Sequence, residues 1–138
     1  MGDDLEKPKE PLSECRVRVV GGYGDIVGLL DSVKEEIYRY NVLASKKGYY
    51  LKPVHKVYKP KGKSGKTIYE YYGRYWWKRL RGRLIYSGTT KPRVLPNPPE
   101  NPLEGLSIVR EGEDVILDCF VYEKYRWIFK DKKVVREL

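Results

Sequence analysis

The sequence predicts an α+β fold in which one amphipathic helix packs on a mainly antiparallel β-sheet. One stretch has helical periodicity, several others alternate or are rich in aromatic and β-branched residues, and turn residues separate them at hairpin spacing. With 138 residues, of which 41% are hydrophobic, the chain has material for one core and little room for two. We therefore expect a single domain over residues 15–138, preceded by a disordered acidic arm at 1–14.

The first strand is expected at 15–20, where CRVRVV alternates apolar and basic residues. A run of glycines ends this strand, and Asp25 is placed to cap the helix that follows. Apolar residues then recur every three or four positions from Ile26 to Ala44, and Gly48 marks the helix end. The pattern predicts a packing helix of about 20 residues.

A basic β-meander is predicted for residues 49–92. Aromatic and aliphatic residues dominate this region, a Lys/Gly-rich loop interrupts it at 60–66, and Arg81-Gly82 has the form of a hairpin turn. The three antiparallel strands are expected at 49–59, 67–80 and 83–90.

The C-terminal third begins with a proline-rich segment, RVLPNPPENPLEG at 93–105, which predicts an extended crossing. Beyond it, apolar and aromatic runs predict further strands, with acidic turn residues between the first two. These C-terminal strands are expected at 106–109, 115–122 and 125–130, with a short edge strand at Val134 and Val135.

Positive charge is concentrated in the middle of the chain. The whole sequence has 28 basic and 19 acidic residues and a net charge of +9, but residues 46–93 alone hold 15 basic residues and one acid, Glu70. The same segment contains eight tyrosines and two tryptophans. Interleaved cations and rings are typical of nucleic-acid-binding surfaces, because cations neutralise phosphates and rings stack on bases. The alternative is an ordinary Tyr-rich sheet that its cations keep soluble.

The register of the hairpin assigns these side chains to two faces. A two-residue turn at Arg81-Gly82 pairs Leu80 with Arg83, so that Trp77 opposes Tyr86 and Trp76 opposes Ser87. The face rich in rings and poor in charge is expected to be the core face, and it carries Tyr69, Tyr71, Tyr75, Trp77, Leu84 and Tyr86. The opposite face is expected to be open to a partner, and it carries Tyr72, Arg74, Trp76, Lys78, Ser87 and Thr89. The alternative is that the chain ends cover this second face and bury Trp76.

We therefore predict a non-enzymatic protein that binds DNA or RNA with weak sequence preference. Its cations would contact phosphates, while Trp76 and Tyr72 would stack on bases or wedge into a groove. The candidate nucleic-acid-binding residues are Lys61, Lys63, Lys66, Tyr72, Arg74, Trp76, Lys78, Arg79, Arg81 and Arg83. The alternative function is a protein-interaction subunit of a nucleic-acid-processing or ribosomal assembly, whose aromatic sheet docks on an acidic protein.

Two glycine-containing motifs invite a cofactor interpretation, but we expect no cofactor. PKGKSGKT at 60–67 approximates a phosphate loop, yet Pro60 replaces its first glycine and a strand-like run follows it where a helix is needed. Gly22, Gly24 and Gly28 lie between a strand and a helix, as in a dinucleotide fingerprint, but no second βα unit follows. A basic hairpin tip and a tight strand-to-helix turn are the simpler explanations.

No catalytic or metal-binding residues are predicted. His55 is the one histidine, and it lies in a basic strand without a neighbouring acid or cysteine, so we expect it to contact a neighbour or a phosphate. The enzymatic alternative is a small Mg²⁺-dependent nuclease built on the acids between 111 and 118. We expect these acids to be solvated or paired with the basic sheet instead, and they are Glu111, Glu113, Asp114 and Asp118.

The remaining features concern the environment of the protein. Two cysteines, Cys15 and Cys119, are too few for a disulfide framework or a four-cysteine zinc site. The sequence alone does not decide whether they form a single disulfide with each other. No apolar stretch is long enough to span a membrane and no secretory signal is visible, so we expect a cytoplasmic protein. The absence of glutamine and the abundance of Lys, Arg, Glu and Tyr favour a thermophilic source.

The segment 59–92, with YEYYGRYWWKRLRGRLIYSGTTKP at its centre, resembles the basic, aromatic hairpins of small uncharacterised archaeal proteins. It is also similar to the arm-type DNA-binding domain of tyrosine recombinases. The shared pattern covers about a quarter of the chain and consists of aromatic-basic strands around a glycine turn. The resemblance implies nucleic-acid binding and no catalytic role, because the chain has no room for the recombinase catalytic residues.

Overall fold

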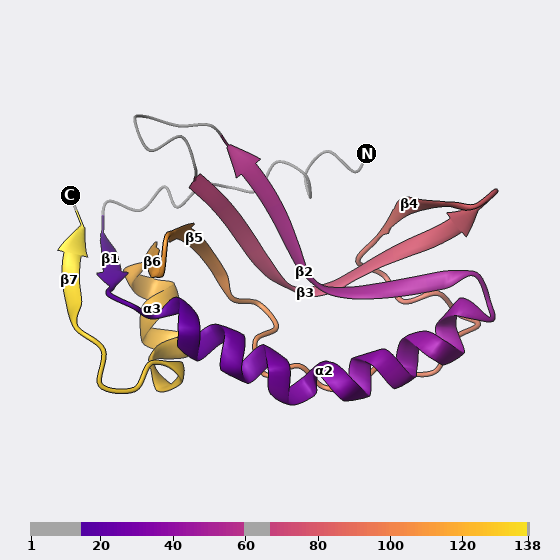
Figure 1. The fold of residues 1–138 in the computed structure, drawn as a ribbon, viewed down its shortest axis with the longest axis horizontal. Helices are drawn as coiled ribbons and strands as arrows, with labels where there is room; N and C mark the ends of the chain where they lie inside the picture. Colours follow the sequence, from indigo (N-terminus) through magenta and orange to yellow (C-terminus); the bar gives the residue numbers. More distant parts are fainter. Residues whose placement is uncertain (1–14, 60–66, 138) are drawn as a thin grey trace.

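The computed structural model describes residues 15–59 and 67–137, which form an α+β fold as predicted. One long helix and one short helix pack on a seven-stranded antiparallel sheet with the order β2-β3-β5-β6-β1-β7, in which β4 pairs with β3 beside β5 (Figure 1). In chain order the elements are β1 (Arg16–Val19), α2 (Tyr23–Ser45), β2 (Tyr49–Lys59), β3 (Thr67–Leu80), β4 (Arg83–Gly88), β5 (Ser107–Glu111), β6 (Asp114–Asp118), α3 (Cys119–Tyr125), the 3-10 helix η1 (Arg126–Ile128) and β7 (Val134–Glu137).

The long helix α2 confirms the predicted amphipathic helix, but it begins earlier than expected. Its first helical residue is Tyr23, and Gly22 stands at the N-cap without a side-chain hydrogen bond. The prediction that Asp25 caps the helix is therefore wrong. The Asp25 carboxylate instead accepts a hydrogen bond from the backbone N–H of Lys130 and pairs with Lys132 at 3.1 Å. It thus fastens the segment before β7 to the first turn of α2.

The meander β2-β3-β4 is also confirmed. Arg81 and Gly82 have φ angles of 53° and 78°, the positive values that a two-residue type I′ hairpin turn requires. The predicted pairs Leu80–Arg83 and Trp77–Tyr86 are present. The register then shifts by one residue, so that Trp76 lies opposite Gly88 and not Ser87. A bulge of this kind is a local irregularity that turn geometry cannot predict.

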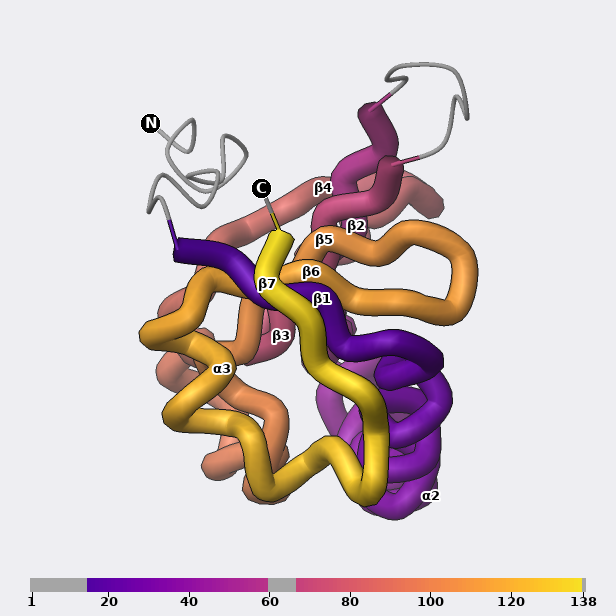
Figure 2. Tube along the Cα trace, turned by 90° about the vertical axis from the view of Figure 1, so that its left-hand side faces the viewer, coloured from indigo at the N-terminus to yellow at the C-terminus, as the bar shows by residue number. Residues whose placement is uncertain are grey.

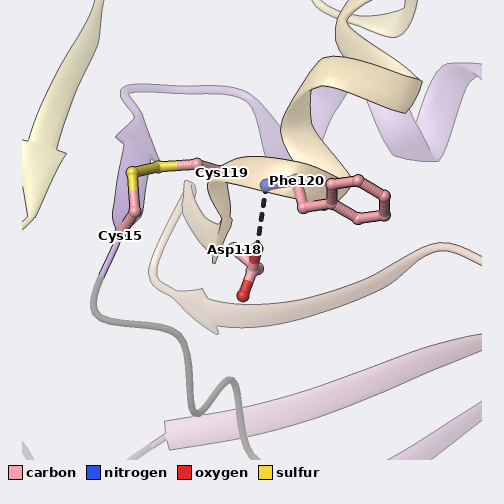
Figure 3. The surroundings of a disulfide bond; sticks show 4 residues. All are labelled: Cys15, Asp118, Cys119 and Phe120. Carbon is pink, nitrogen blue, oxygen red and sulfur yellow. Dashed lines mark hydrogen bonds between the residues drawn. A yellow bond between two sulfur atoms is a disulfide. The ribbon is translucent and has the colours of Figure 1, made fainter.

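The C-terminal third differs from prediction. The expected strand at 115–122 ends at Asp118, whose carboxylate caps α3 by accepting a hydrogen bond from Phe120 N at 2.8 Å. The expected strand at 125–130 is occupied by the end of α3, the 3-10 helix η1 and an extended segment. The short edge strand is present as β7. A disulfide between Cys15 and Cys119 ties the start of β1 to the start of α3, with Cα atoms 5.4 Å apart (Figure 3).

Both helices lie on the same side of the sheet, below the strands in Figures 1 and 2. Residues of β1, β6, α2, α3 and η1 form the larger core there, and a second core under the β2-β3 hairpin contains Tyr40, Leu51 and Trp76. The predicted proline-rich crossing also packs on this side, where Leu95 and Leu103 are buried. Among the described elements, no helix lies on the opposite face of the sheet.

Candidate nucleic-acid interface

The face that was predicted to be open is the face that the helices cover. Trp76 is 0% exposed and packs edge-on against Tyr40 of α2, with ring centroids 5.9 Å apart. Tyr72 is 3% exposed. Arg74, between them, forms an ion pair with Glu104 of the crossing at 3.4 Å. The prediction that Trp76 and Tyr72 stack on bases is therefore wrong, because neither ring is accessible.

The neighbouring strand explains which face became the core. Leu51 of β2 lies opposite Trp76, and Val54 lies opposite Tyr72, so this face combines aliphatic and aromatic residues across strands. On the other face, β2 places Lys52 opposite Tyr75 and His55 opposite Tyr71. A helix buries the aliphatic face because covering lysines would cost desolvation energy. Ring content along β3 alone does not distinguish the two faces.

Glu70, the one acid of the basic segment, lies in the core on the helix side. It is 0% exposed, and its carboxylate accepts hydrogen bonds from the hydroxyls of Tyr23, at 3.1 Å, and Tyr72. Lys56 lies 3.9 Å from it. Burial raises the pKa of Tyr72, as does the bond to Glu70, so this hydroxyl stays protonated and donating. Because its acceptor sites are used internally, Glu70 serves the core and not a ligand.

The opposite side of β2, β3 and β4 carries a cluster of rings that we call the open face. His55 lies 5.4 Å from Tyr75 and 6.0 Å from Tyr86, and Trp77 contacts Tyr86 edge-on at 5.3 Å, all measured between ring centroids. The expectation that His55 contacts a neighbour is thus confirmed. These rings are half-buried against one another. The residues of the open face are Lys52, His55, Lys59, Tyr71, Tyr75, Trp77 and Tyr86. Beside them on the same side of the sheet, Tyr69 is buried in a small cluster with Val109 and Ile116.

Two lysines of the open face are held over aromatic rings. The Nζ atom of Lys52 lies 4.9 Å from the Trp77 ring centroid, and that of Lys59 lies 4.9 Å from the Tyr69 ring centroid. Cation–π contacts of this length restrict the conformations of the lysine side chains. A hollow of about 430 Å³ adjoins Lys52 and Trp77 along the edge strand β2, and Lys56 contributes to its lining. The rings therefore position cations, which is a different role from the predicted base stacking.

The hairpin that joins β3 to β4 carries four of the predicted site residues. Lys78, Arg79, Arg81 and Arg83 are all exposed. Neither these four nor Lys52 has a carboxylate partner within the part of the chain that the structure describes. The remaining candidates of the predicted set, Lys61, Lys63 and Lys66, lie outside the described residues.

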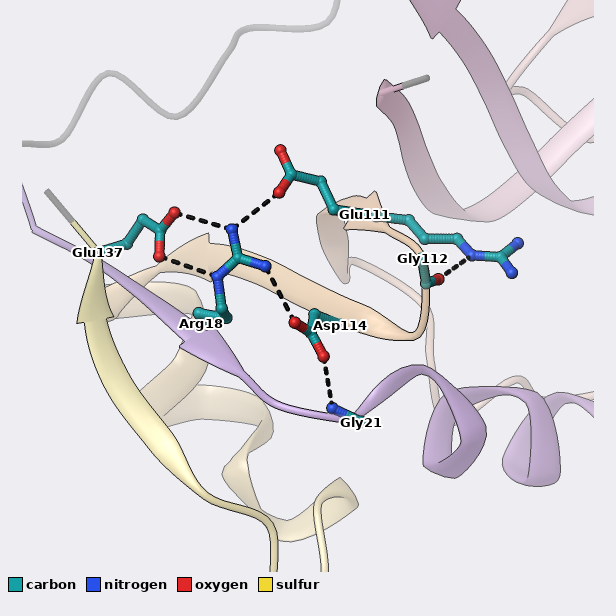
Figure 4. Close-up of polar contacts among 7 residues, drawn as sticks. Arg18, Gly21, Glu111, Gly112, Asp114 and Glu137 are labelled. Atoms are coloured by element: carbon teal, nitrogen blue, oxygen red, sulfur yellow. Dashed lines mark hydrogen bonds and ion pairs between the residues drawn. The ribbon is translucent and has the colours of Figure 1, made fainter. Parts of the chain in front are cut away.

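Acidic side chains at the other end of the sheet are paired. The guanidinium of Arg18 donates to Glu111 at 2.8 Å, to Asp114 at 3.0 Å and to Glu137 at 2.9 and 3.0 Å (Figure 4). The N–H of Gly21 and, to a lesser degree, Arg18 hold the pKa of Asp114 below its ordinary value, and Arg18 does the same for Glu137. Each of these three carboxylates therefore has a basic partner within the chain.

Three of the turn acids are paired, but with arginines of β1 and β5 and not with the basic meander. Glu111 and Asp114 bind Arg18, Glu113 lies 3.6 Å from Arg110, and Asp118 caps α3. Within residues 15–59 and 67–137, no group of three or more histidine, cysteine or acidic side chains is arranged to hold a metal ion.

The glycine motif at 22–28 has a packing explanation. A Cβ atom at Gly22 would lie 2.8 Å from Cγ1 of Val19, closer than real Cβ contacts allow, so only glycine fits this strand-to-helix turn. At Gly24 and Gly28 a Cβ would meet nothing within 4 Å. The motif PKGKSGKT leads into strand β3 at Thr67, which leaves it without the helix that a phosphate loop needs.

Sequence reasoning missed Lys52 and Lys59 as site residues. Both belong to β2, and their importance comes from the rings of β3 beneath them. The signal that could have found them is the cross-strand pairing of 49–59 with 67–80, which places lysines opposite or next to aromatic residues on one face.

Comparison with protein-family models, curated proteins and solved structures finds no match to this chain. None of the helices in the described ranges is both long and apolar enough to cross a membrane.

Proposed function

We propose that this protein binds nucleic acid without catalysing a reaction, through the cations of β2, β3 and β4. The observation that carries the proposal is the contrast in charge pairing. At one end of the sheet the acids have basic partners, whereas Lys52 and the hairpin cations have no carboxylate partner among the described residues. A polyanion supplies the missing counter-charge.

Phosphates are the groups that these cations are suited to contact. Lys52 and Lys59 are held over rings on the open face, so little side-chain freedom remains to be lost on binding. The rings are half-buried against each other, which leaves backbone contacts as the main interaction. Binding through phosphates predicts weak sequence preference and strong salt dependence.

A salt titration of two matched double variants tests the proposal. Lys52→Gln with Lys59→Gln removes two cations from the open face, and Lys34→Gln with Arg39→Gln removes two exposed cations from α2. For duplex DNA, the first pair should reduce the slope of log affinity against log salt by about 1.8, or about 0.9 per lost contact. The second pair should leave the slope unchanged. Equal slopes for both pairs would show that binding depends only on the net charge of the protein. That result would reject the open face as the binding site.

A protein-interaction subunit is the second candidate, and an apolar groove favours it. The groove has a volume of about 460 Å³, runs between α2 and β2, and is lined by Leu30, Ile37, Tyr38, Val42, Tyr50 and Pro53 among others. Tyr38 is 69% exposed on its rim. Capture of a protein partner that survives nuclease treatment and is abolished by Val42→Asp would favour this function over nucleic-acid binding.

We also propose that this protein is cytoplasmic and comes from a thermophilic archaeon. The lack of glutamine and the abundance of charged residues and tyrosine support a thermophilic source. The disulfide is compatible with it, because intracellular proteins of hyperthermophiles commonly carry disulfides. A thermal unfolding midpoint below about 60 °C, within the mesophilic range, would contradict this origin.

A further inference from the structure

The end of the β3-β4 hairpin is a two-stranded ribbon, which we define as Lys78–Ile85. β2 begins at Tyr49 opposite Lys78, and Gly48 O still accepts a hydrogen bond from Arg79 N at 2.8 Å, so among the described residues no third strand accompanies the ribbon beyond Arg79. Every residue from Lys78 to Ile85 is exposed. Figure 1 shows this hairpin extending to one end of the molecule, away from β1 and β7. The ribbon is therefore free to enter a space that the rest of the sheet cannot.

Cations lie on both faces of the ribbon and at its tip. Arg79 pairs with Leu84 on one face, and Arg83 pairs with Leu80 on the other. Arg81 occupies the turn. A sheet that docks flat needs cations on one face only, whereas a ribbon between two phosphate backbones needs them on both. No acidic residue occurs between Glu70 and Glu100 to oppose such a partner.

The turn itself carries a cation where another residue would be more stable. Arg81 has a φ of 53°, in the left-handed region that asparagine and glycine adopt more easily. Asn-Gly is the preferred pair for a type I′ turn. Strained positions of this kind concentrate at functional sites, because the side chain has a use that outweighs its conformational cost.

From these observations we infer that the ribbon inserts into the major groove of double-stranded DNA. Two strands about 4.8 Å apart, with their side chains, match a groove about 12 Å wide. Arg79 and Arg83 then contact the two flanking backbones, Arg81 reaches the groove floor, and Leu80, Leu84 and Ile85 meet apolar surface such as thymine methyl groups. The A-form major groove of RNA is too narrow for this fit. The inference rests on the proposed nucleic-acid binding and specifies double-stranded DNA as the nucleic acid that is bound.

The test compares three probes of one sequence: duplex DNA, one strand of it, and the corresponding duplex RNA. Tightest binding to duplex DNA is expected, with protection of guanine N7, a major-groove atom, from dimethyl sulfate. Arg79→Gln and Arg83→Gln should each reduce the salt slope by about 0.9 on duplex DNA. Arg81→Asn should weaken binding to duplex DNA while leaving the thermal midpoint unchanged or higher. Arg39→Gln, on the outer surface of α2, is the control and should change neither quantity.

Two failures are distinguishable. If no probe binds, both the proposed function and the inference are wrong. If the probes bind but duplex RNA competes equally with duplex DNA, guanine N7 is not protected, or only Arg79→Gln of the opposed pair has an effect, the inference is overturned while nucleic-acid binding stands.

Discussion

The two ends of the sheet treat their charges in opposite ways. At the closed end, formed by β1, β5, β6, β7 and α3, Arg18 binds three carboxylates and the disulfide fixes β1 to α3. At the open end, formed by β2, β4 and the second half of β3, the exposed cations of the hairpin have no acidic partner among the described residues. The closed end pairs its acidic side chains within the chain, whereas the hairpin cations of the open end have no such pairing among the described residues.

Together with the proposed function, this difference predicts that the closed end provides stability and the open end provides binding. Covalent and ionic links at the closed end stabilise the fold, so variants there are expected to change the free energy of unfolding and not nucleic-acid affinity. Variants in the exposed hairpin are expected to do the reverse, because solvated surface residues contribute little to stability. The predictions below test this separation.

Removing the disulfide should have the largest effect on stability. The bridge closes a sequence separation of 104 residues. The chain-entropy model gives a contribution of about 4.7 kcal/mol to the free energy of unfolding for a loop of this length. The double variant Cys15→Ala with Cys119→Ala, measured by denaturant unfolding, should lose about that much. At a temperature where it stays folded, its affinity for duplex DNA should equal that of the parent. A loss below about 1 kcal/mol would contradict the assigned role of the bridge.

Asn41 should be the most sensitive side chain where α2 covers the edge of the open end. Its amide nitrogen donates to Leu51 O at 2.9 Å, and its amide oxygen accepts from Leu51 N at 2.8 Å. The helix side chain thus satisfies the outer edge of β2 as a further strand would. Asn41→Leu leaves both buried backbone groups without partners and should lower the free energy of unfolding by about 2 to 3 kcal/mol.

Equilibrium unfolding in denaturant measures the Asn41 effect. Ser45→Ala, one turn further along α2, is the matched control, since that hydroxyl is exposed and bonds within the helix. It should change the free energy of unfolding by less than about 0.5 kcal/mol. Equal losses for the two variants would show that Asn41 has no special role at the strand edge.

Local patterns predicted the parts of the fold that local physics determines. The periodicity of 26–44 identified α2, and Arg81-Gly82 identified the hairpin and most of its register. The strands expected at 115–122 and 125–130 failed because Asp118 caps a helix there, and because Tyr125 and Ile128, three residues apart, are both buried in the larger core. Tertiary packing overrode the β-propensity of those residues.

The candidate site was predictable in its composition and not in its orientation. The basic segment and the exposed arginines of the hairpin follow from the sequence, but the choice of core face depended on Leu51 and Val54 of a different strand. Because side chains alternate between the two faces of a strand, choosing the wrong core face assigns every side chain of the strand to the wrong side. Trp76 was therefore assigned to the surface although α2 covers it.

The smallest predicted effect is a difference in how the stability contributions of the two ends depend on pH. At the closed end the pKa values of Asp114 and Glu137 lie below their ordinary 3.8 and 4.5, so their contribution to stability is lost as the pH falls below about 4. At the open end, burial raises the pKa of Tyr75 from 10.0 to about 12. Its contribution is complete below pH 10 and is lost as the pH rises toward 12, because the unfolded chain ionises first. Between pH 9 and 11, Tyr75→Phe should therefore lose about 1 kcal/mol less stability than the parent. Denaturant unfolding at both pH values measures this, and an identical loss in both proteins would show that Tyr75 ionises as readily in the folded chain as in the unfolded one.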